Sequence, residues 1–244
     1  MRTLCIAVLC ALPFIALADN DISQVNRSIR VEAAQSVGNV ESVNGSIHVE
    51  DGATTRDISS VNGSIDIGSR ATTGKVNTVN GGIHLDNASK IASIETVNGT
   101  VKVGAGTQVS GNVSAVNGQI SLAKDASVEG SLENVNGRIE LDAASVGKGI
   151  RTTNGDIDIG TGSRVQGGIL VEKPHHIGWG KRRTPSVIIG PDAVVNGALR
   201  FERAVMLYVS DRATIGSISG ATPIRFTGEQ PSDADRSAAE KLEK

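Results

Sequence analysis

The chain has 244 residues, a formal net charge of −2, and among its aromatic residues only three Phe, one Tyr and one Trp. So weak a charge provides no general attraction for nucleic acid, and none is expected as a partner. Globular cores normally rely on aromatic rings, so a core that packs almost entirely through aliphatic side chains is expected here.

Residues 1–18 have the form of an export signal. A basic second residue precedes an apolar run from Leu4 to Leu17, and small residues lead up to Ala18. The competing interpretation is a retained anchor, but the run is shorter than the roughly 20 residues that a bilayer requires. Cleavage near Ala18 predicts a periplasmic, secreted or surface protein without a transmembrane segment. Because Cys5 and Cys10 both lie inside the signal, no disulfide or thiol chemistry is expected in the mature chain.

The segment from 19 to 171 is dominated by one repeat, Val-Asn-Gly-x-Ile-x-Val, which returns every 18 or 19 residues. Repeats of this length are typical of solenoids, and apolar alternation with a period of two indicates strands and not helices. The Asn-Gly pairs are Asn44 and Gly45, Asn62 and Gly63, Asn80 and Gly81, Asn98 and Gly99, Asn117 and Gly118, Asn136 and Gly137, and Asn154 and Gly155.

This repeat predicts an all-β, single-stranded parallel β-helix with about 18–19 residues per coil. A six-residue sub-period divides each coil into three sides, hence a triangular cross-section, while the handedness stays open. One inward column should be Ile29, Ile47, Ile65, Ile83, Val101, Ile120, Ile139 and Ile157. A second should be Val31, Val49, Ile67, Leu85, Val103, Leu122, Leu141 and Ile159. Stacked coils bury these columns against one another, which a single coil cannot do.

The Asn-Gly pairs allow two interpretations. Glycine tolerates positive φ and asparagine follows it, so the pair suits a corner of the coil, where stacked amides could also form a ladder. The alternative is a straight strand whose asparagines face solvent.

A loop is predicted at 172–186, where prolines, glycines and charged residues interrupt the repeat. Its candidate interaction residues are His175, His176, Trp179, Lys181, Arg182 and Arg183. The only tryptophan beside dense positive charge could dock an acidic polysaccharide, a phospholipid head group or another partner. The alternative is a solvated insertion that shields one side of the solenoid.

Coils of a hexapeptide type are predicted to resume at 187–228, with Phe201, Tyr208 and Phe226 sealing the end of the stack. Residues 229–244 form a polar tail, expected to be frayed or a short surface helix.

Two family resemblances follow from these motifs. The Val-Asn-Gly-x-Ile coils, over roughly 25–171, resemble the DUF4097 family of exported, adhesin-like bacterial β-solenoids. The stretch from Ile189 to Gly216 resembles the polymer-forming bactofilins, which are cytoplasmic filament formers, so the export signal departs from that family. Neither resemblance brings a catalytic residue onto this chain.

The histidines give no metal site by this reasoning. His48 and His84 share an outward column with Asp66 between them, about 9.6 Å apart from two strand spacings, whereas one metal needs their nitrogens roughly 4 Å apart. An exposed row of mixed charge is the expected role of this column.

No hydrolase, zinc-protease or phosphate-loop motif is present. The function expected is therefore a non-catalytic structural or interaction scaffold of the bacterial cell envelope, without cofactor. Exposed strand edges at the coil ends favour end-to-end self-association as well as binding to an envelope component. The alternative is a polysaccharide-active β-helix enzyme.

Overall fold

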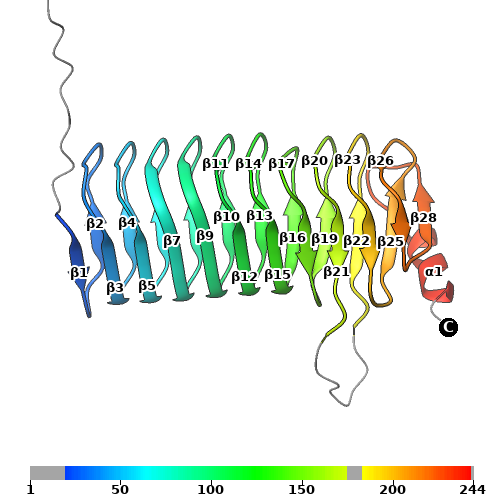
Figure 1. Ribbon diagram of the computed structural model, residues 1–244, viewed down its shortest axis with the longest axis horizontal. Coiled ribbons are helices and arrows are strands. Elements are labelled where there is room, and N and C mark those ends of the chain that lie inside the picture. The colour runs from blue at the N-terminus through cyan, green and yellow to red at the C-terminus, as the bar shows by residue number, and fades with distance from the viewer. Residues whose placement is uncertain (1–19, 175–182, 243–244) are drawn as a thin grey trace, which may run out of the picture.

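The computed structural model describes residues 20–174 and 183–242, and it forms a parallel β-solenoid of about eleven coils. Figure 1 shows the coils side by side along the long axis, from β1 at one end to β28 and α1 at the other. Every strand pairing is parallel and joins a strand to its counterpart one coil away, as between β4 and β6. The all-β solenoid predicted from the repeat is confirmed.

One side of the solenoid is an 11-stranded sheet with one strand from each coil. Its strands are β2 (Ile29–Val31), β4 (Ile47–Val49), β6 (Ile65–Ile67), β8 (Ile83–Leu85), β10 (Val101–Val103), β13 (Ile120–Leu122), β16 (Arg138–Leu141), β19 (Asp156–Ile159), β22 (Ser186–Ile189), β25 (Met206–Ser210) and β28 (Pro223–Phe226). The sheet therefore runs the whole length of the described solenoid.

A 17-stranded sheet covers the other two sides of each coil. Its strands are β1 (Ile22–Gln24), β3 (Val40–Asn44), β5 (Ile58–Asn62), β7 (Thr72–Asn80), β9 (Lys90–Asn98), β11 (Gln108–Val109), β12 (Val113–Asn117), β14 (Ser127–Val128), β15 (Leu132–Asn136), β17 (Ser145–Val146), β18 (Ile150–Thr152), β20 (Arg164–Val165), β21 (Ile169–Val171), β23 (Val194–Val195), β24 (Leu199–Phe201), β26 (Thr214–Ile215) and β27 (Ile218–Ser219). The two sides belong to one sheet because β7 and β9 continue through the corner that separates β11 from β12 in the next coil. Each coil thus has the three sides expected.

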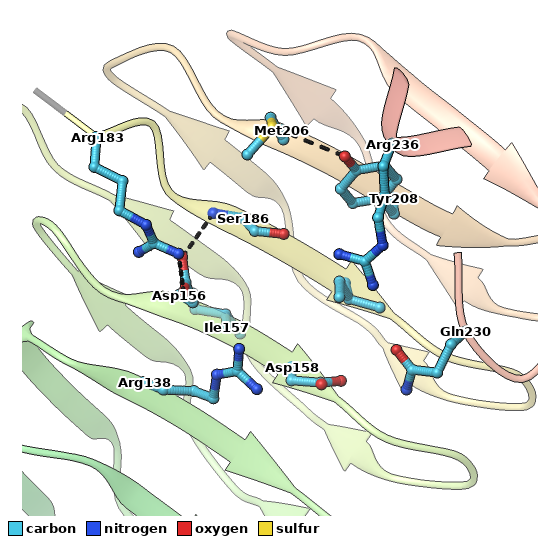
Figure 2. Close-up of a pocket in the computed structure, with 11 residues that line it drawn as sticks. Arg138, Asp156, Ile157, Asp158, Arg183, Ser186, Met206, Tyr208, Gln230 and Arg236 are labelled. Carbon is cyan, nitrogen blue, oxygen red and sulfur yellow. Dashed lines mark hydrogen bonds and ion pairs between the residues drawn. The ribbon is translucent and has the colours of Figure 1, made fainter. Parts of the chain in front are cut away.

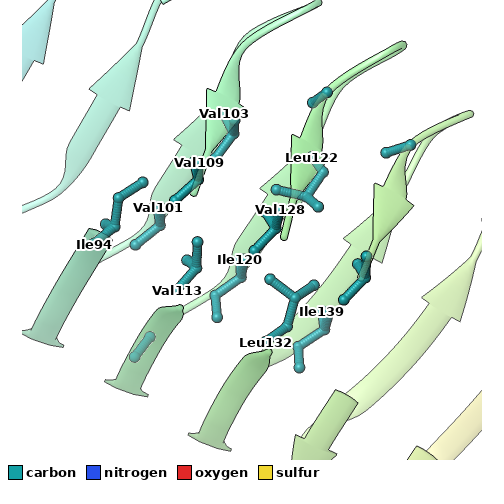
Figure 3. Close-up of a cluster of buried hydrophobic side chains, with 14 of the residues drawn as sticks. Ile94, Val101, Val103, Val109, Val113, Ile120, Leu122, Val128, Leu132 and Ile139 are labelled. Atoms are coloured by element: carbon teal, nitrogen blue, oxygen red, sulfur yellow. The ribbon is translucent and has the colours of Figure 1, made fainter. Parts of the chain in front are cut away.

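The core consists of the inward aliphatic columns. All members of the two predicted columns are buried, and none exposes more than 4% of its surface. Figure 3 shows Val101, Ile120 and Ile139 following one another through successive coils, with Ile94, Val113 and Leu132 from the facing sheet beside them. Burying each such side chain contributes about 1.5–3 kcal/mol. Repetition of this contribution explains how the stack forms with so few aromatic rings.

The Asn-Gly pairs lie where the chain passes from the 17-stranded to the 11-stranded sheet, as between β3 and β4. A Cβ atom on any of the seven glycines would lie 1.8–2.4 Å from the carbonyl oxygen of the equivalent residue one coil earlier. Only Gly137 among them has a positive φ in the left-handed region, at 133°. The expectation of positive φ at these pairs is therefore wrong for the other six, and close stacking of the coils is the reason for glycine.

Left-handed backbone occurs instead at the next corner, between the 11-stranded sheet and the following strand of the 17-stranded sheet. Residues with positive φ at this corner are Ala34, Gly52, Arg70, Ala88, Gly106, Asp125, Ala143, Gly162 and Asp192. Several carry a side chain even though this conformation favours glycine. Space for a Cβ exists there, because Gly52, Gly106 and Gly162 have no atom within 4 Å of the Cβ position.

The last coils differ from the others in having a cover on their outside. Helix α1 (Asp233–Leu242) lies against β25 and β28 of the 11-stranded sheet. Phe201 belongs to the main core, whereas Tyr208 and Phe226 pack with Ile188 in a separate cluster. Sealing of the stack by all three aromatic residues is therefore wrong for Tyr208 and Phe226, which pack outside the core.

Candidate functional site

The outward column of the 11-stranded sheet changes from polar to apolar near its C-terminal end. In register it reads Arg30, His48, Asp66, His84, Lys102, Ser121, Glu140, Asp158, Ile188, Tyr208 and Ile224. Ile188, the first apolar member, packs in one cluster with Tyr208, and α1 contacts the next two strands, β25 and β28. A cavity of about 250 Å³ lies at this boundary, between the last polar residues and the covered cluster (Figure 2).

The histidines of this column form separate contacts. His48 Nδ1 lies 3.2 Å from Asp66 Oδ2, while His84 Nε2 lies 3.5 Å from Asp86 Oδ1. Within residues 20–174 and 183–242 no group of three or more His, Cys, Asp or Glu residues is arranged to hold a metal ion. The exposed row of mixed charge is what the geometry shows in these coils.

Asp156 forms one wall of the cavity and is fully engaged. Its side chain is 11% exposed, its Oδ2 lies 2.6 Å from Arg183 Nη2, and its Oδ1 accepts a 2.9 Å hydrogen bond from the Ser186 backbone N–H. The hydrogen bond and charge of Asp156 raise the pKa of Arg183 further above its ordinary value. This pair ties the C-terminal end of the predicted loop to the solenoid.

Asp158 lines the same cavity but differs from Asp156 in its contacts. Its Oδ1 is buried without a hydrogen-bond partner. Burial, together with the charge of Glu140, raises the pKa of this carboxyl, although Arg138 and Arg236 act in the opposite direction. The Ser186 hydroxyl oxygen is buried without a partner as well. Buried polar atoms are nearly always paired, so two such atoms lining one cavity mark a place where a ligand could supply the missing bonds.

Arg138 and Arg236 bring positive charge to the same cavity from opposite sides. Arg138 begins β16, and Arg236 lies in α1. Figure 2 shows both guanidinium groups extending toward the space above Asp158, with Tyr208 behind Arg236. The cavity therefore joins a strand of the repeat region to the C-terminal helix.

Of the candidate interaction residues predicted from sequence, Arg183 is described by the structure, and it lies at this cavity. His175, His176, Trp179, Lys181 and Arg182 lie outside the described residues, as does the export signal at 1–18. Sequence reasoning did not identify Arg138, Asp158 and Arg236 as site residues. Arg138 lies in the repeat, Asp158 in the outward row of mixed charge, and Arg236 in the polar tail. The change in the outward column at Ile188 is the signal that could have indicated a covering element.

A ladder of asparagine side chains leads along the Asn-Gly corner to the base of the loop. Each Nδ2 donates to the Oδ1 of the asparagine one coil earlier, at 2.8–3.0 Å, from Asn154 back to Asn26. Arg203 ends the ladder by donating to Asn154 Oδ1 at 2.7 Å, and it also donates to the backbone oxygens of Thr153 and Arg183, each at 3.1 Å. The ladder and the loop end therefore share one cap.

The valines of the motif form an apolar stripe beside this ladder. Six of the seven expose 39–60% of their surface, and Val97 is half-buried; the six are Val25, Val43, Val61, Val79, Val116 and Val135. From Val43 onward the residue before each valine is buried, and Thr78 and Thr96 donate 3.2 Å hydrogen bonds to the carbonyl oxygens of Gly63 and Gly81. The corner thus presents a regular surface of amides and valines along the repeat region.

Comparison of the chain with protein-family models, with curated proteins and with solved structures found no match. The β-solenoid fold therefore rests on the structure, and the resemblances to the DUF4097 and bactofilin families rest on the sequence motifs. In the described part of the chain, α1 is the only helix, and no helix there is long and apolar enough to span a membrane.

Proposed function

We propose that this protein is an exported, non-catalytic scaffold of the bacterial cell envelope, with an adhesin-like or self-assembling role. The observation that carries this proposal is a single continuous stack of about eleven coils. At roughly 4.8 Å per coil the stack is a rod about 50 Å long. Solenoids use such extended surfaces for binding and assembly.

The side-chain contacts support a role in which stiffness matters. The asparagine ladder joins eight successive coils, and the close glycine contacts leave no room for the coils to slip. A ladder of this kind adds bonds along the axis that the backbone alone does not provide. The rod is thus suited to present surfaces at fixed spacing.

Export and family membership are the finer parts of the proposal. The apolar segment before Ala18 supports export, and the Val-Asn-Gly coils over 25–171 support a relation to the DUF4097 proteins. The coils at Ile189 to Gly216 resemble bactofilins, which supports self-assembly. In the described residues β2 pairs only with β4 and β28 only with β25, so each end of the sheet carries a strand edge that could pair with another copy.

Cell fractionation with mass analysis of the purified protein tests export. The expected result is a mature chain beginning at Asp19 in the periplasmic, envelope or secreted fraction, with a variant lacking 1–18 retained in the cytoplasm as the control. An unprocessed wild-type chain in the cytoplasm would overturn the proposal.

Sedimentation of the mature protein, alone and with isolated envelope polysaccharide, tests the scaffold role. Self-association or co-sedimentation is expected, and electron microscopy of the protein with and without 172–185 shows whether the loop region controls assembly. A strictly monomeric protein that binds no envelope component would remove the support for this function.

A further inference from the structure

The charges around the cavity favour a ligand with a single negative charge. Asp156 and Arg183 neutralise one another through their 2.6 Å contact. Arg138 and Arg236 then face the carboxyl of Asp158, so the residues that line the cavity keep one net positive charge. Glu140, one coil earlier, adds negative charge beside Asp158 and further disfavours a doubly charged ligand. A phosphate monoester carries about −1.5 to −2 at neutral pH and would exceed this balance. A carboxylate matches it.

The unpartnered polar atoms require hydroxyl groups on the same ligand. Asp158 Oδ1 can only be satisfied by a donor while it is ionised, and the Ser186 hydroxyl can donate or accept. A ligand hydroxyl can donate to Asp158, whereas a carboxylate placed there would meet like charge. The two guanidinium groups offer the paired N–H donors that bind carboxylates well.

The remaining wall and the size limit the ligand to one ring. Ile188 and Tyr208 give an apolar side against which the C–H groups of a sugar ring can pack. The volume of about 250 Å³ is below the roughly 300–1,000 Å³ of typical small-molecule sites, so the cavity itself has room for about one sugar ring.

We infer that the cavity between Arg138, Asp158 and Arg236 binds one hexuronate unit of an acidic saccharide, with the carboxylate on the arginines and a ring hydroxyl on Asp158. The inference deepens the proposed function by naming the class of envelope component, and it rests on that function only for the source of the saccharide. Because Arg236 belongs to α1 and Arg138 to β16, binding would also link the helix to the repeat region.

Calorimetric titration of the purified mature protein tests the inference. The probes are galacturonate and glucuronate, with galactose lacking the carboxylate, and acetate and inorganic phosphate lacking the ring hydroxyls. Saturable binding of at least one uronate is expected, with galactose and acetate at least tenfold weaker. Arg138→Gln and Arg236→Gln should each weaken uronate binding about tenfold or more, which corresponds to at least about 1.4 kcal/mol. Lys102→Gln, in the same outward column three coils from Asp158, should leave it unchanged.

The outcomes separate the inference from the proposed function. Equal binding of acetate or phosphate would show a general anion site and overturn the inference, as would uronate binding that survives both arginine substitutions. No uronate binding, in a protein that still co-sediments with envelope material, would overturn the inference alone. Uronate binding by a protein retained in the cytoplasm would leave the site standing and refute the envelope role. Far-ultraviolet circular dichroism of each variant checks that the solenoid is intact.

Discussion

Two glycine substitutions in one coil separate the two reasons why glycine occurs at corners. Gly99 follows β9 at an Asn-Gly corner, and a Cβ there would lie 1.9 Å from the Gly81 carbonyl oxygen. Gly106 lies at the left-handed corner of the same coil, with φ of 66° and no atom within 4 Å of a Cβ. The first is required for space and the second for backbone conformation. Gly99→Ala and Gly106→Ala should therefore lower the free energy of unfolding by different amounts.

The structure provides the magnitudes. In Gly99→Ala, moving the new Cβ from 1.9 Å to about 3.0 Å, the lower limit of real contacts, requires a shift of about 1.1 Å between two coils. Such overpacking costs about 1–3 kcal/mol, and the 3.0 Å hydrogen bond from Gly81 N to the Asn98 oxygen, between the same two coils, would weaken with it, adding about 0.5–1.5 kcal/mol. Gly99→Ala should thus lose about 2–4 kcal/mol.

Gly106→Ala should lose much less. An alanine in the left-handed region costs roughly 1–2 kcal/mol, of which about 0.4–1 kcal/mol is offset by the stiffer unfolded chain. The protein already accepts this situation one coil earlier, where Ala88 has a φ of 59° at the same corner. The expected net loss is about 1 kcal/mol or below.

Urea unfolding followed by circular dichroism measures both free energies of unfolding. Hydrogen exchange adds a local reading, because a solenoid can lose one interface without losing the rest. Exchange should increase at Gly81, whose N–H bonds to the Asn98 oxygen, in Gly99→Ala and stay near wild type in Gly106→Ala. Equal losses in the two variants, or a larger loss at Gly106, would refute the argument that coil contact demands glycine at the Asn-Gly corner.

Three further substitutions test the contacts around the cavity. Arg203→Ala removes three hydrogen bonds at the end of the ladder, and it should lower the melting temperature by a few degrees and speed hydrogen exchange at Asn154; unchanged exchange there would contradict the capping role. Arg183→Gln leaves the buried carboxylate of Asp156 without its ion partner and should cost about 1–3 kcal/mol in urea unfolding, whereas no loss would show that the Ser186 N–H suffices. Asp158→Asn tests the raised pKa of that carboxyl. Because the folded protein binds the carboxyl proton of Asp158 more tightly than the unfolded chain does, the free energy of unfolding of wild type falls as pH rises through the raised pKa. The variant should therefore be more stable than wild type at neutral pH, and the difference should shrink toward about pH 4, where an unfolded Asp titrates; a difference independent of pH would exclude Asp158 as its cause.

Strand positions and core columns could be predicted because the same apolar pattern recurs in every copy of the repeat. Within a strand, alternation places every second residue inward, so Ile47 and Val49 follow directly from the period of two. A single copy would have been ambiguous. Copies in register made the inward columns, the three sides and the parallel stacking predictable.

The corners could not be predicted in the same way. Val40 and Ser42 are buried as alternation requires, but Val43 and Asn44 at the end of β3 are both exposed, so alternation fails at Asn44. The direction of a side chain at a corner depends on the local backbone path, which the apolar pattern does not encode. The requirement for glycine was recognisable, but its physical cause lay in the preceding coil.

The cavity was beyond sequence reasoning because two of its arginines, Arg138 and Arg236, are far apart in the chain. Arg236 contributes only because α1 docks on the outside of β25 and β28, and the composition of 229–244 indicated a polar tail. The outward column did indicate that the sheet is covered at this end, because exposing Ile188 and Tyr208 together to solvent would be unfavourable. In the 11-stranded sheet, where the preceding outward residues are polar, the change to apolar residues at Ile188 therefore indicates a covering element.

The identity of residue 203 follows from the position of the loop. The corner after Asn154 is the site of the 172–186 segment, so the next rung of the ladder is absent and the following corner, after β24, holds Arg203. An asparagine reaches only one coil, roughly 4.8 Å, whereas the gap here is two coils. A long side chain with several donors can cross that gap, and Arg203 reaches the Asn154 amide and the Arg183 carbonyl at once. The insertion thus accounts for an arginine at a corner where the repeat region has asparagine.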